Sequence, residues 1–172
     1  MDTNLYFFTA TINQWIPLLK DDSFKTIITD SLSFLVKNGR VKVYAFVIMT
    51  NHIHLIWLIN ENHNLSDVQR DFLKFTAQQF RFRLIDSGKT EYLEKFNVDK
   101  SDRQYLFWQS RPLSVELWSD KVIDQKMDYI HNNPCQEKEE LTDLPENYKY
   151  SSASFYINEE TEWNFLSHIG EL

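Results

Sequence analysis

Apolar residues are distributed along this chain in two distinct patterns. Short segments are dominated by apolar residues, whereas longer segments repeat an apolar residue every three or four positions. Side chains alternate between two faces in a strand and recur with a period of 3.6 in a helix, so both kinds of element are predicted. We predict strands at 6–12, 41–48, 53–59, 104–108 and 153–156, and helices at 23–37, 66–85 and about 119–133. A charged, mobile stretch is expected at 86–102, and the order of elements favours an α+β fold over a doubly wound parallel sheet.

The longest apolar run, 41–59, contains two histidines one residue apart, His52 and His54. In a strand both side chains leave the backbone on the same face, with Ile53 turned to the other face. Two adjacent imidazoles can bind a metal ion, but hydrogen-bonded polar residues on a partly exposed sheet face have the same pattern. The run by itself therefore leaves both interpretations open.

The third predicted helix, 119–133, has recognisable ends. Ser119 or Asp120 can cap its first turn, and Pro134 disfavours helical backbone in the residue before it. The apolar stripe of this helix consists of Ile123, Met127 and Ile130. This spacing of i, i+4 and i+7 predicts an amphipathic helix that packs against a sheet.

Two polar residues of the same helix, Tyr129 and Asn133, are four positions apart. They lie one turn from each other and flank the apolar stripe, so their hydroxyl and amide oxygens can face a metal held by His52 and His54. Each also has an ordinary interpretation. A tyrosine often lies at the rim of a core, and an asparagine often ends a helix.

The second predicted helix, 66–85, carries basic residues between phenylalanines. The residues expected in the core by their helical spacing are Leu65, Val68, Phe72, Phe75 and Phe82. The basic residues left on its flanks are Arg70, Lys74, Arg81 and Arg83. Farther along, Arg103 and Arg111 bracket Trp108, and these three are candidates for phosphate contact or base stacking. Such residues suit a nucleic-acid backbone, although a solvated helix face has the same composition.

The formal net charge of −7 is unfavourable for binding DNA, because affinity for DNA depends on neutralising phosphates. The charge is concentrated in an acidic C-terminal segment, 136–172, where nine acidic residues stand against two lysines. Residues 1–135 are therefore neutral, and the composition remains compatible with a DNA-binding protein.

The length of 172 residues suits one domain, 1–172, with a core of its own. Cys135 is the one cysteine, so no intrachain disulfide forms and a reducing cytoplasm suits the chain. Residues 1–4 lack the basic and apolar regions of a secretion signal. Lys42, Asn51 and the two histidines interrupt the run 41–59, so we expect no membrane span and a cytoplasmic protein.

Four motifs follow one another in the order VIMTNHIHLIW (47–57), FWQ (107–109), DYIHNNP (128–134) and LPENYKYSS (144–152). Together they resemble the single-tyrosine transposases of the HUH endonuclease superfamily, and most closely the REP-associated tyrosine transposases. The resemblance spans roughly 6–156, and its specificity comes from the combination. It implies a ferredoxin-like antiparallel sheet packed with helices, with His-x-His on a central strand and a nucleophilic tyrosine on a C-terminal helix.

The resemblance also implies a metal-dependent endonuclease and strand transferase acting on single-stranded or hairpin DNA. His52, His54 and Asn133 would hold Mg²⁺ or Mn²⁺ at the scissile phosphate, and Tyr129 would attack to form a 5′-phosphotyrosine. A phenol has a pKa of about 10 in water, so Tyr129 needs a nearby positive charge or the metal itself. Lys126 is the candidate for that charge, or else an ordinary solvated lysine. Related transposases include monomers and homodimers with the tyrosine in trans, and both states stay open.

One departure from the family concerns the residues after Pro134. Relatives commonly have small, apolar and basic residues there, whereas 135–140 of this chain is CQEKEE. Negative charge near the tyrosine repels DNA. Two other functions therefore stay open: a domesticated module that binds hairpin or single-stranded DNA without cleaving it, and a phosphodiesterase that uses water in place of Tyr129.

Overall fold

The structure is a computed structural model that describes residues 4–136 and 138–172. The strands are β1 (Leu5–Thr11), β2 (Val41–Ile48), β3 (His52–Ile59), β4 (Asn97–Lys100), β5 (Arg103–Tyr105) and β6 (Leu113–Glu116). The α-helices are α1 (Asp22–Lys37), α2 (Leu65–Asp86), α3 (Thr90–Glu94), α4 (Asp120–Asn132) and α5 (Ala153–Ile157). Most of the N-terminal stretch 1–4 and Glu137 of the acidic segment lie outside the described residues.

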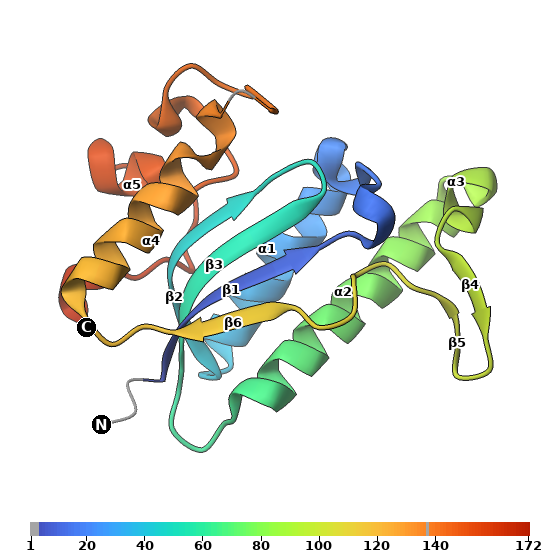
Figure 1. Ribbon diagram of the computed structural model, residues 1–172, viewed down its shortest axis with the longest axis horizontal. Coiled ribbons are helices and arrows are strands. Elements are labelled where there is room, and N and C mark those ends of the chain that lie inside the picture. The colour runs from blue at the N-terminus through green and yellow to red at the C-terminus, as the bar shows by residue number, and fades with distance from the viewer. Residues whose placement is uncertain (1–3, 137) are drawn as a thin grey trace.

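Four of the strands form the main sheet, in the order β2-β3-β1-β6 (Figure 1). All neighbouring strands in it are antiparallel. Helix α1 connects β1 to β2, and α2 lies between β3 and β6 along the chain. This β-α-β-β-α-β succession with its strand order is the ferredoxin-like arrangement, so the α+β fold class predicted from the sequence is confirmed.

The sheet separates two hydrophobic clusters because successive residues of each strand face opposite sides. On β3, Leu55 and Trp57 pack with residues of α1 and α2. Ile56, between them in sequence, belongs to the second cluster, which includes residues of α4 on the other face of the sheet. Figure 1 shows α4 and α5 on one side of the molecule and α2, α3 and the β4–β5 hairpin on the opposite side.

Helix α4 begins and ends as its sequence predicts. The Ser119 hydroxyl accepts a hydrogen bond from the Val122 amide at 3.4 Å, which caps the first turn. The α-helix ends at Asn132, and a 3₁₀ turn, Asn133–Cys135, contains Pro134. The predicted stripe of Ile123, Met127 and Ile130 is buried. Packing of this stripe on the sheet fixes the rotation of the helix, and with it the direction of Tyr129.

The C-terminal segment runs along the outer edge of β2. Ser151 forms an antiparallel bridge with Val47, and Leu166 forms a parallel bridge with Val43. The Tyr148 hydroxyl donates to the Ile48 carbonyl at 2.6 Å. These contacts protect an edge strand that would otherwise be open to pairing with other chains.

The prediction of a strand at 153–156 is wrong, because these residues belong to α5. The bridge to β2 ends at Ser151, and Ser152, whose amide donates to the Phe46 carbonyl at 3.0 Å, already has φ −82° and ψ 1°. The Ser151 hydroxyl then accepts from the Ala153 amide at 3.1 Å, and α5 follows. A serine that bonds a nearby backbone amide starts a helix here, and this local effect outweighs the β propensity of Phe155 and Tyr156.

Two further predictions need correction. The stretch 86–102, expected to be mobile, contains α3 and β4, and β4 pairs with β5 in a hairpin. On α2, Phe75 and Phe82 were expected in the core but are 49% and 51% exposed. The buried residues of α2 are Val68, Phe72, Thr76, Phe80 and Leu84. They lie four residues apart, so the stripe includes a threonine that a purely hydrophobic pattern misses.

Among the described residues, no helix combines the length and apolar character that crossing a membrane requires.

Candidate active site and basic groove

His52 and His54 lie on β3, an inner strand of the sheet, and face the side that α4 covers. Their ring centroids are 4.9 Å apart. Phe7 of β1 stacks on the His54 ring at a centroid distance of 5.4 Å. The predicted same-face placement of the two imidazoles is therefore present, on a strand held on both sides by neighbours.

Each imidazole is oriented through one ring nitrogen. Nδ1 of His54 lies 2.7 Å from the Thr9 hydroxyl on β1. Nδ1 of His52 lies 2.7 Å from the Asn51 side-chain oxygen. In metal-binding histidines of other proteins, a hydrogen bond at the ring nitrogen that does not face the metal fixes the orientation of the ring. Bonds of this kind at Nδ1 leave Nε2 for a metal.

The two Nε2 atoms differ from the Nδ1 atoms in their partners. Nε2 of His54 is buried and has no hydrogen-bond partner among the described residues. Nε2 of His52 lies 3.3 Å from the Asn133 side-chain oxygen. A buried nitrogen without a partner is costly, so such an atom in a native site indicates a ligand or an ion that supplies the missing contact.

Burial also holds both imidazoles in the neutral form. It lowers the pKa of His54 to about 3, and the charges of His52 and Lys126 act in the same direction. Burial lowers the pKa of His52 as well, against the opposing effects of Glu139 and the Asn133 hydrogen bond. A neutral imidazole keeps the lone pair that a metal requires.

Tyr129 lies beside these histidines on α4. Its ring centroid is 5.1 Å from that of His54, with the two rings edge to face. The residue is 45% exposed, so part of its side chain is open to an incoming molecule. Lys126 Nζ lies 5.7 Å from the centre of the Tyr129 ring and 4.5 Å from that of Phe7. The lysine singled out from the sequence is therefore close to the tyrosine.

The arrangement fits a divalent cation. It offers the unpartnered Nε2 of His54, the Nε2 of His52 and the amide oxygen of Asn133, which lies 3.3 Å from that second nitrogen. Within residues 4–136 and 138–172, no cluster of three or more His, Cys, Asp or Glu side chains could hold a metal. An ion bound at the two histidines would thus take other ligands from Asn133, water and a bound phosphate.

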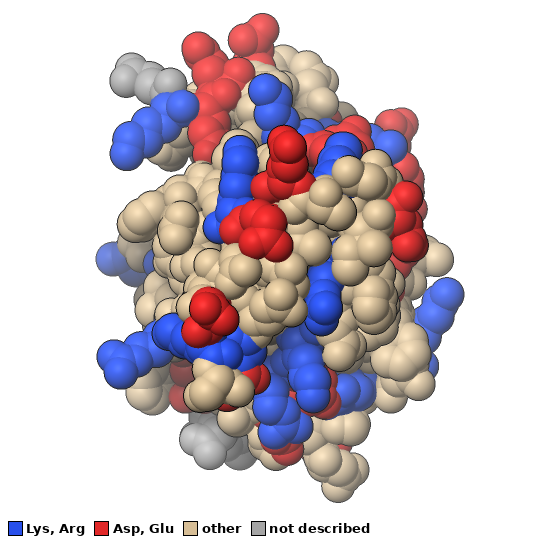
Figure 2. Space-filling view, turned by 90° about the vertical axis from the view of Figure 1, so that its right-hand side faces the viewer, with Lys and Arg blue, Asp and Glu red and all other residues tan. Residues whose placement is uncertain are grey.

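Several of the predicted basic residues meet in a second place, a groove of about 480 Å³ between α2 and the segment 103–112. We call it the basic groove. Its lining includes Arg70, Lys74, Arg103, Trp108 and Arg111. Figure 2 views the side of the molecule that carries α2 and the β4–β5 hairpin, and Lys and Arg gather in the lower part of that face. The cations that were scattered along the sequence are brought together by the packing of this segment on α2.

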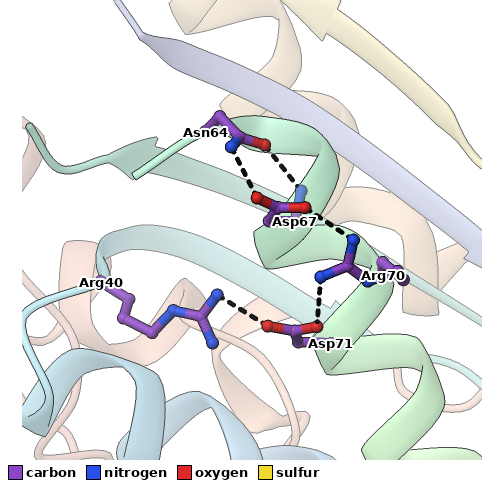
Figure 3. A network of polar contacts seen from close by, with 5 residues as sticks. All are labelled: Arg40, Asn64, Asp67, Arg70 and Asp71. Carbon is purple, nitrogen blue, oxygen red and sulfur yellow. Dashed lines mark hydrogen bonds and ion pairs between the residues drawn. The ribbon is translucent and has the colours of Figure 1, made fainter. Parts of the chain in front are cut away.

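The charges in the basic groove are not equally available. Arg70 contacts Asp67 at 2.7 Å and Asp71 at 3.1 Å, and Asp71 also pairs with Arg40 at 2.9 Å (Figure 3). Arg103 pairs with its exposed neighbour Asp102 at 3.2 Å. Within the described part of the chain, Lys74 and Arg111 form no ion pair. These two cations are the ones free to meet a phosphate.

The other predicted DNA contacts divide further. Trp108 is corrected from a stacking candidate to a core residue, since it is 5% exposed and its indole N–H donates to the Thr76 hydroxyl at 2.9 Å. Arg81 lies over the ring of Tyr105, 5.2 Å from its centre. Arg83 lines a separate depression with Asp86 and Phe82. The structure therefore leaves Arg83 away from the groove.

The groove and the histidines are linked through β1. The Gln109 amide at the groove donates to the Thr11 carbonyl at 2.7 Å, and Thr11 is paired with His52 across the sheet. Past Arg111, whose backbone is left-handed at φ 60°, the chain enters β6, where Leu113 pairs with Thr9. A non-glycine residue in that conformation is strained, and such strain is common at binding sites.

Sequence reasoning missed two residues of the site. Asn51 is adjacent to His52 and was noted only as an interruption of the apolar run, so its position could have suggested its role. Thr9 is 45 residues from His54 and carries no local mark. Only the register of β1 against β3, in which Thr9 lies opposite His54, identifies it.

No protein-family model and no curated protein matches this sequence. Solved structures that resemble the fold include two transposases. One is a REP-associated tyrosine transposase bound to a REP hairpin, with a TM-score of 0.64 and 18% identity over 98% of this chain and 94% of that chain. The other is a candidate transposase from Deinococcus radiodurans, with a TM-score of 0.48 and 18% identity over 74% and 88% of the two chains.

The fold is thus similar to that of a REP-associated tyrosine transposase. More particularly, the resemblance to the REP-associated tyrosine transposases drawn from the four motifs is confirmed by the first of these structures. A likeness at this identity establishes the fold, and the chemistry of the site rests on the geometry of its own residues.

Proposed function

We propose that this protein is a metal-dependent endonuclease and strand transferase for single-stranded DNA, which acts at hairpin-containing DNA through a 5′-phosphotyrosine. The observation that carries the proposal is the unpartnered Nε2 of a neutral, buried His54 beside the exposed Tyr129. The structural neighbour bound to a REP hairpin supports the choice of hairpin DNA.

His52, His54 and Asn133 would hold Mg²⁺ or Mn²⁺. When bound, such an ion withdraws charge from the phosphodiester and orients it. Thr9 and Asn51 keep the two imidazoles in their orientation, and Phe7 shields His54 from water.

Tyr129 is the proposed nucleophile. It gives up its phenolic proton to water, its oxygen forms a bond to phosphorus, the bond from phosphorus to the 3′ oxygen breaks, and the leaving oxygen takes a proton from water to become a 3′-hydroxyl. The energy of the phosphodiester is conserved in the phosphotyrosine, so a second DNA end can later displace it. Lys126, next to the Tyr129 ring, stabilises the phenolate that attacks.

The basic groove would hold the DNA outside the reacting phosphate. Lys74 and Arg111 are free of ion pairs among the described residues, and the groove ends where β6 begins, one strand away from Thr9. The histidines face the α4 side of the sheet, so DNA held in the groove would pass the edge strand β6 to reach them. Its affinity should depend on salt because phosphate contacts release counterions.

Two other functions make different demands on the same residues. A module that binds hairpins without cleaving them needs the groove and has no use for Tyr129. A phosphodiesterase that uses water needs the histidines and not the tyrosine. The geometry favours the transferase because Tyr129 is exposed, is next to His54 and lies on a helix whose orientation the core fixes.

The test is a denaturing gel of the protein incubated with Mn²⁺ and labelled hairpin oligonucleotides. We expect a covalent protein–DNA band that disappears in Tyr129→Phe and in the His52→Ala/His54→Ala double variant. Cleavage that survives in Tyr129→Phe would identify the water-using phosphodiesterase. Binding without cleavage by the unaltered chain would identify the binding module.

A further inference from the structure

Glu139 lies in the turn that follows α4, inside the acidic run after Pro134. Its Oε2 accepts a hydrogen bond from the Thr50 hydroxyl at 3.1 Å. Thr50 belongs to the connection between β2 and β3 and precedes His52 by two residues. Inside the turn, the Leu141 amide donates to the Pro134 carbonyl at 2.8 Å. The carboxylate is therefore anchored to the hairpin that carries the histidines.

The charge of Glu139 is not neutralised by a neighbour. Among the described residues it takes part in no ion pair, and its side chain is half-buried. Its hydrogen-bond partner Thr50 stands just before the strand that carries His52 and His54. Negative charge from an element distant in sequence is thus held at the end of β3 where the histidines lie.

The ligand set at the histidines lacks such charge of its own. Two neutral imidazoles and the amide of Asn133 carry none, whereas Mg²⁺ and Mn²⁺ sites usually include a carboxylate or a phosphate. The buried Nε2 of His54, which has no partner, indicates independently that an ion or ligand belongs here. A cation at this place needs a nearby anion before DNA arrives.

We propose that Glu139 is an outer carboxylate of the divalent-cation site, which hydrogen-bonds to water carried by the ion and raises its affinity in the absence of DNA. The inference rests on the proposed metal-dependent function. It gives one of the acidic residues after Pro134 a role in holding the ion. Thr50 is a positioning residue that keeps the carboxylate in place.

The test is a titration of the full chain with Mn²⁺ in the absence of DNA, followed by the electron paramagnetic resonance signal of the free ion. One negative charge about 6 Å from a divalent ion in water changes its affinity about tenfold, so Glu139→Gln should weaken binding by that factor. Glu140→Gln is the matched control, because Glu140 is the exposed neighbour and forms no contact with the site. Thr50→Val should weaken binding less than Glu139→Gln.

The same affinity in Glu139→Gln and Glu140→Gln would overturn the inference, and so would the absence of Mn²⁺ binding by the unaltered chain. Urea unfolding of each variant shows whether the fold is kept. The covalent-band experiment at saturating Mn²⁺ separates the two proposals. If the covalent band forms but Glu139→Gln leaves the Mn²⁺ affinity unchanged, the proposed transferase stands and the role of Glu139 is removed. If Glu139→Gln weakens Mn²⁺ binding tenfold but no band forms, the role of Glu139 stands and the transferase is removed.

Discussion

The histidine site faces α4, whereas the basic groove lies on the α2 side of the sheet, and the two are built on opposite principles. At the site, neutral imidazoles are buried, oriented by Thr9 and Asn51, and packed against Phe7. In the groove, charged side chains such as Lys74 are exposed on α2. The difference teaches that the proposed chemistry would depend on desolvation and fixed geometry, whereas the proposed DNA binding would depend on charge that solvent can reach.

The largest effect should come from removing the histidines. We expect His52→Ala/His54→Ala to lower the cleavage rate at saturating DNA by at least about 10³-fold, because the electrostatic stabilisation of the phosphate is lost. Hairpin affinity, measured in the same samples by fluorescence anisotropy, should change less than twofold. An equal loss of affinity would mean that the site and the groove are not separate.

Lowering the pH should reduce the stability of the protein through a buried histidine on the same face of the sheet as the site. Buried His131, whose Nε2 is 2.8 Å from the Ser152 hydroxyl, has its pKa lowered by burial to about 4 from 6.5. As the pH falls below about 6.5, this imidazole therefore takes up a proton in the unfolded chain but stays neutral in the folded chain. This group alone should lower the free energy of unfolding by about 2 kcal/mol between pH 7.5 and pH 5.

Urea unfolding at the two pH values measures this loss. His131→Gln should show a smaller fall in stability between pH 7.5 and pH 5, and the exposed His63→Gln should keep the full fall. An unchanged pH dependence in His131→Gln would contradict the account.

Removing the free cations of the groove should weaken binding without altering chemistry. Lys74→Ala/Arg111→Ala should lower hairpin affinity about 10- to 30-fold and reduce the slope of log affinity against log salt by about 1.5 to 2. The cleavage rate at saturating DNA should stay the same. Arg83→Ala is the control, because it also removes one positive charge but lies in a separate depression.

The smallest effect is expected for Arg70→Ala. Arg70 lines the same groove, but its guanidinium is already paired with Asp67 and Asp71 (Figure 3). Exposed pairs of this kind contribute little to stability, and their loss frees two carboxylates as well as removing one cation. Hairpin affinity should fall less than threefold, and a fall as large as that for Lys74→Ala would show that Arg70 leaves its partners to bind DNA.

The parts of the fold that sequence reasoning predicted are those with a local cause. The cap at Ser119, the stripe on α4 and the alternation that places His52 and His54 on one face each depend on residues a few positions apart. The fold class followed from the order of these elements. Tyr129 was placed beside the histidines because its helix has one apolar face and one way to pack.

The parts that were missed depend on distant contacts. Strand β6 has four residues, too few for its alternation to stand out, and only pairing with β1 makes it a strand. Thr50 and Glu139 are 89 residues apart, and no local sequence pattern predicts their hydrogen bond. Trp108 was misplaced on the surface because its partner Thr76 lies on another element.

The most direct test of the central claim is to identify the atom to which DNA becomes attached. Oligonucleotides that carry a label 3′ or 5′ of the cleavage position should be incubated with the protein and Mn²⁺, and the covalent product digested for peptide mass spectrometry. The account predicts that only the 3′ label stays with the protein, on the peptide that contains Tyr129. A covalent bond at another residue, or retention of the 5′ label, would contradict it.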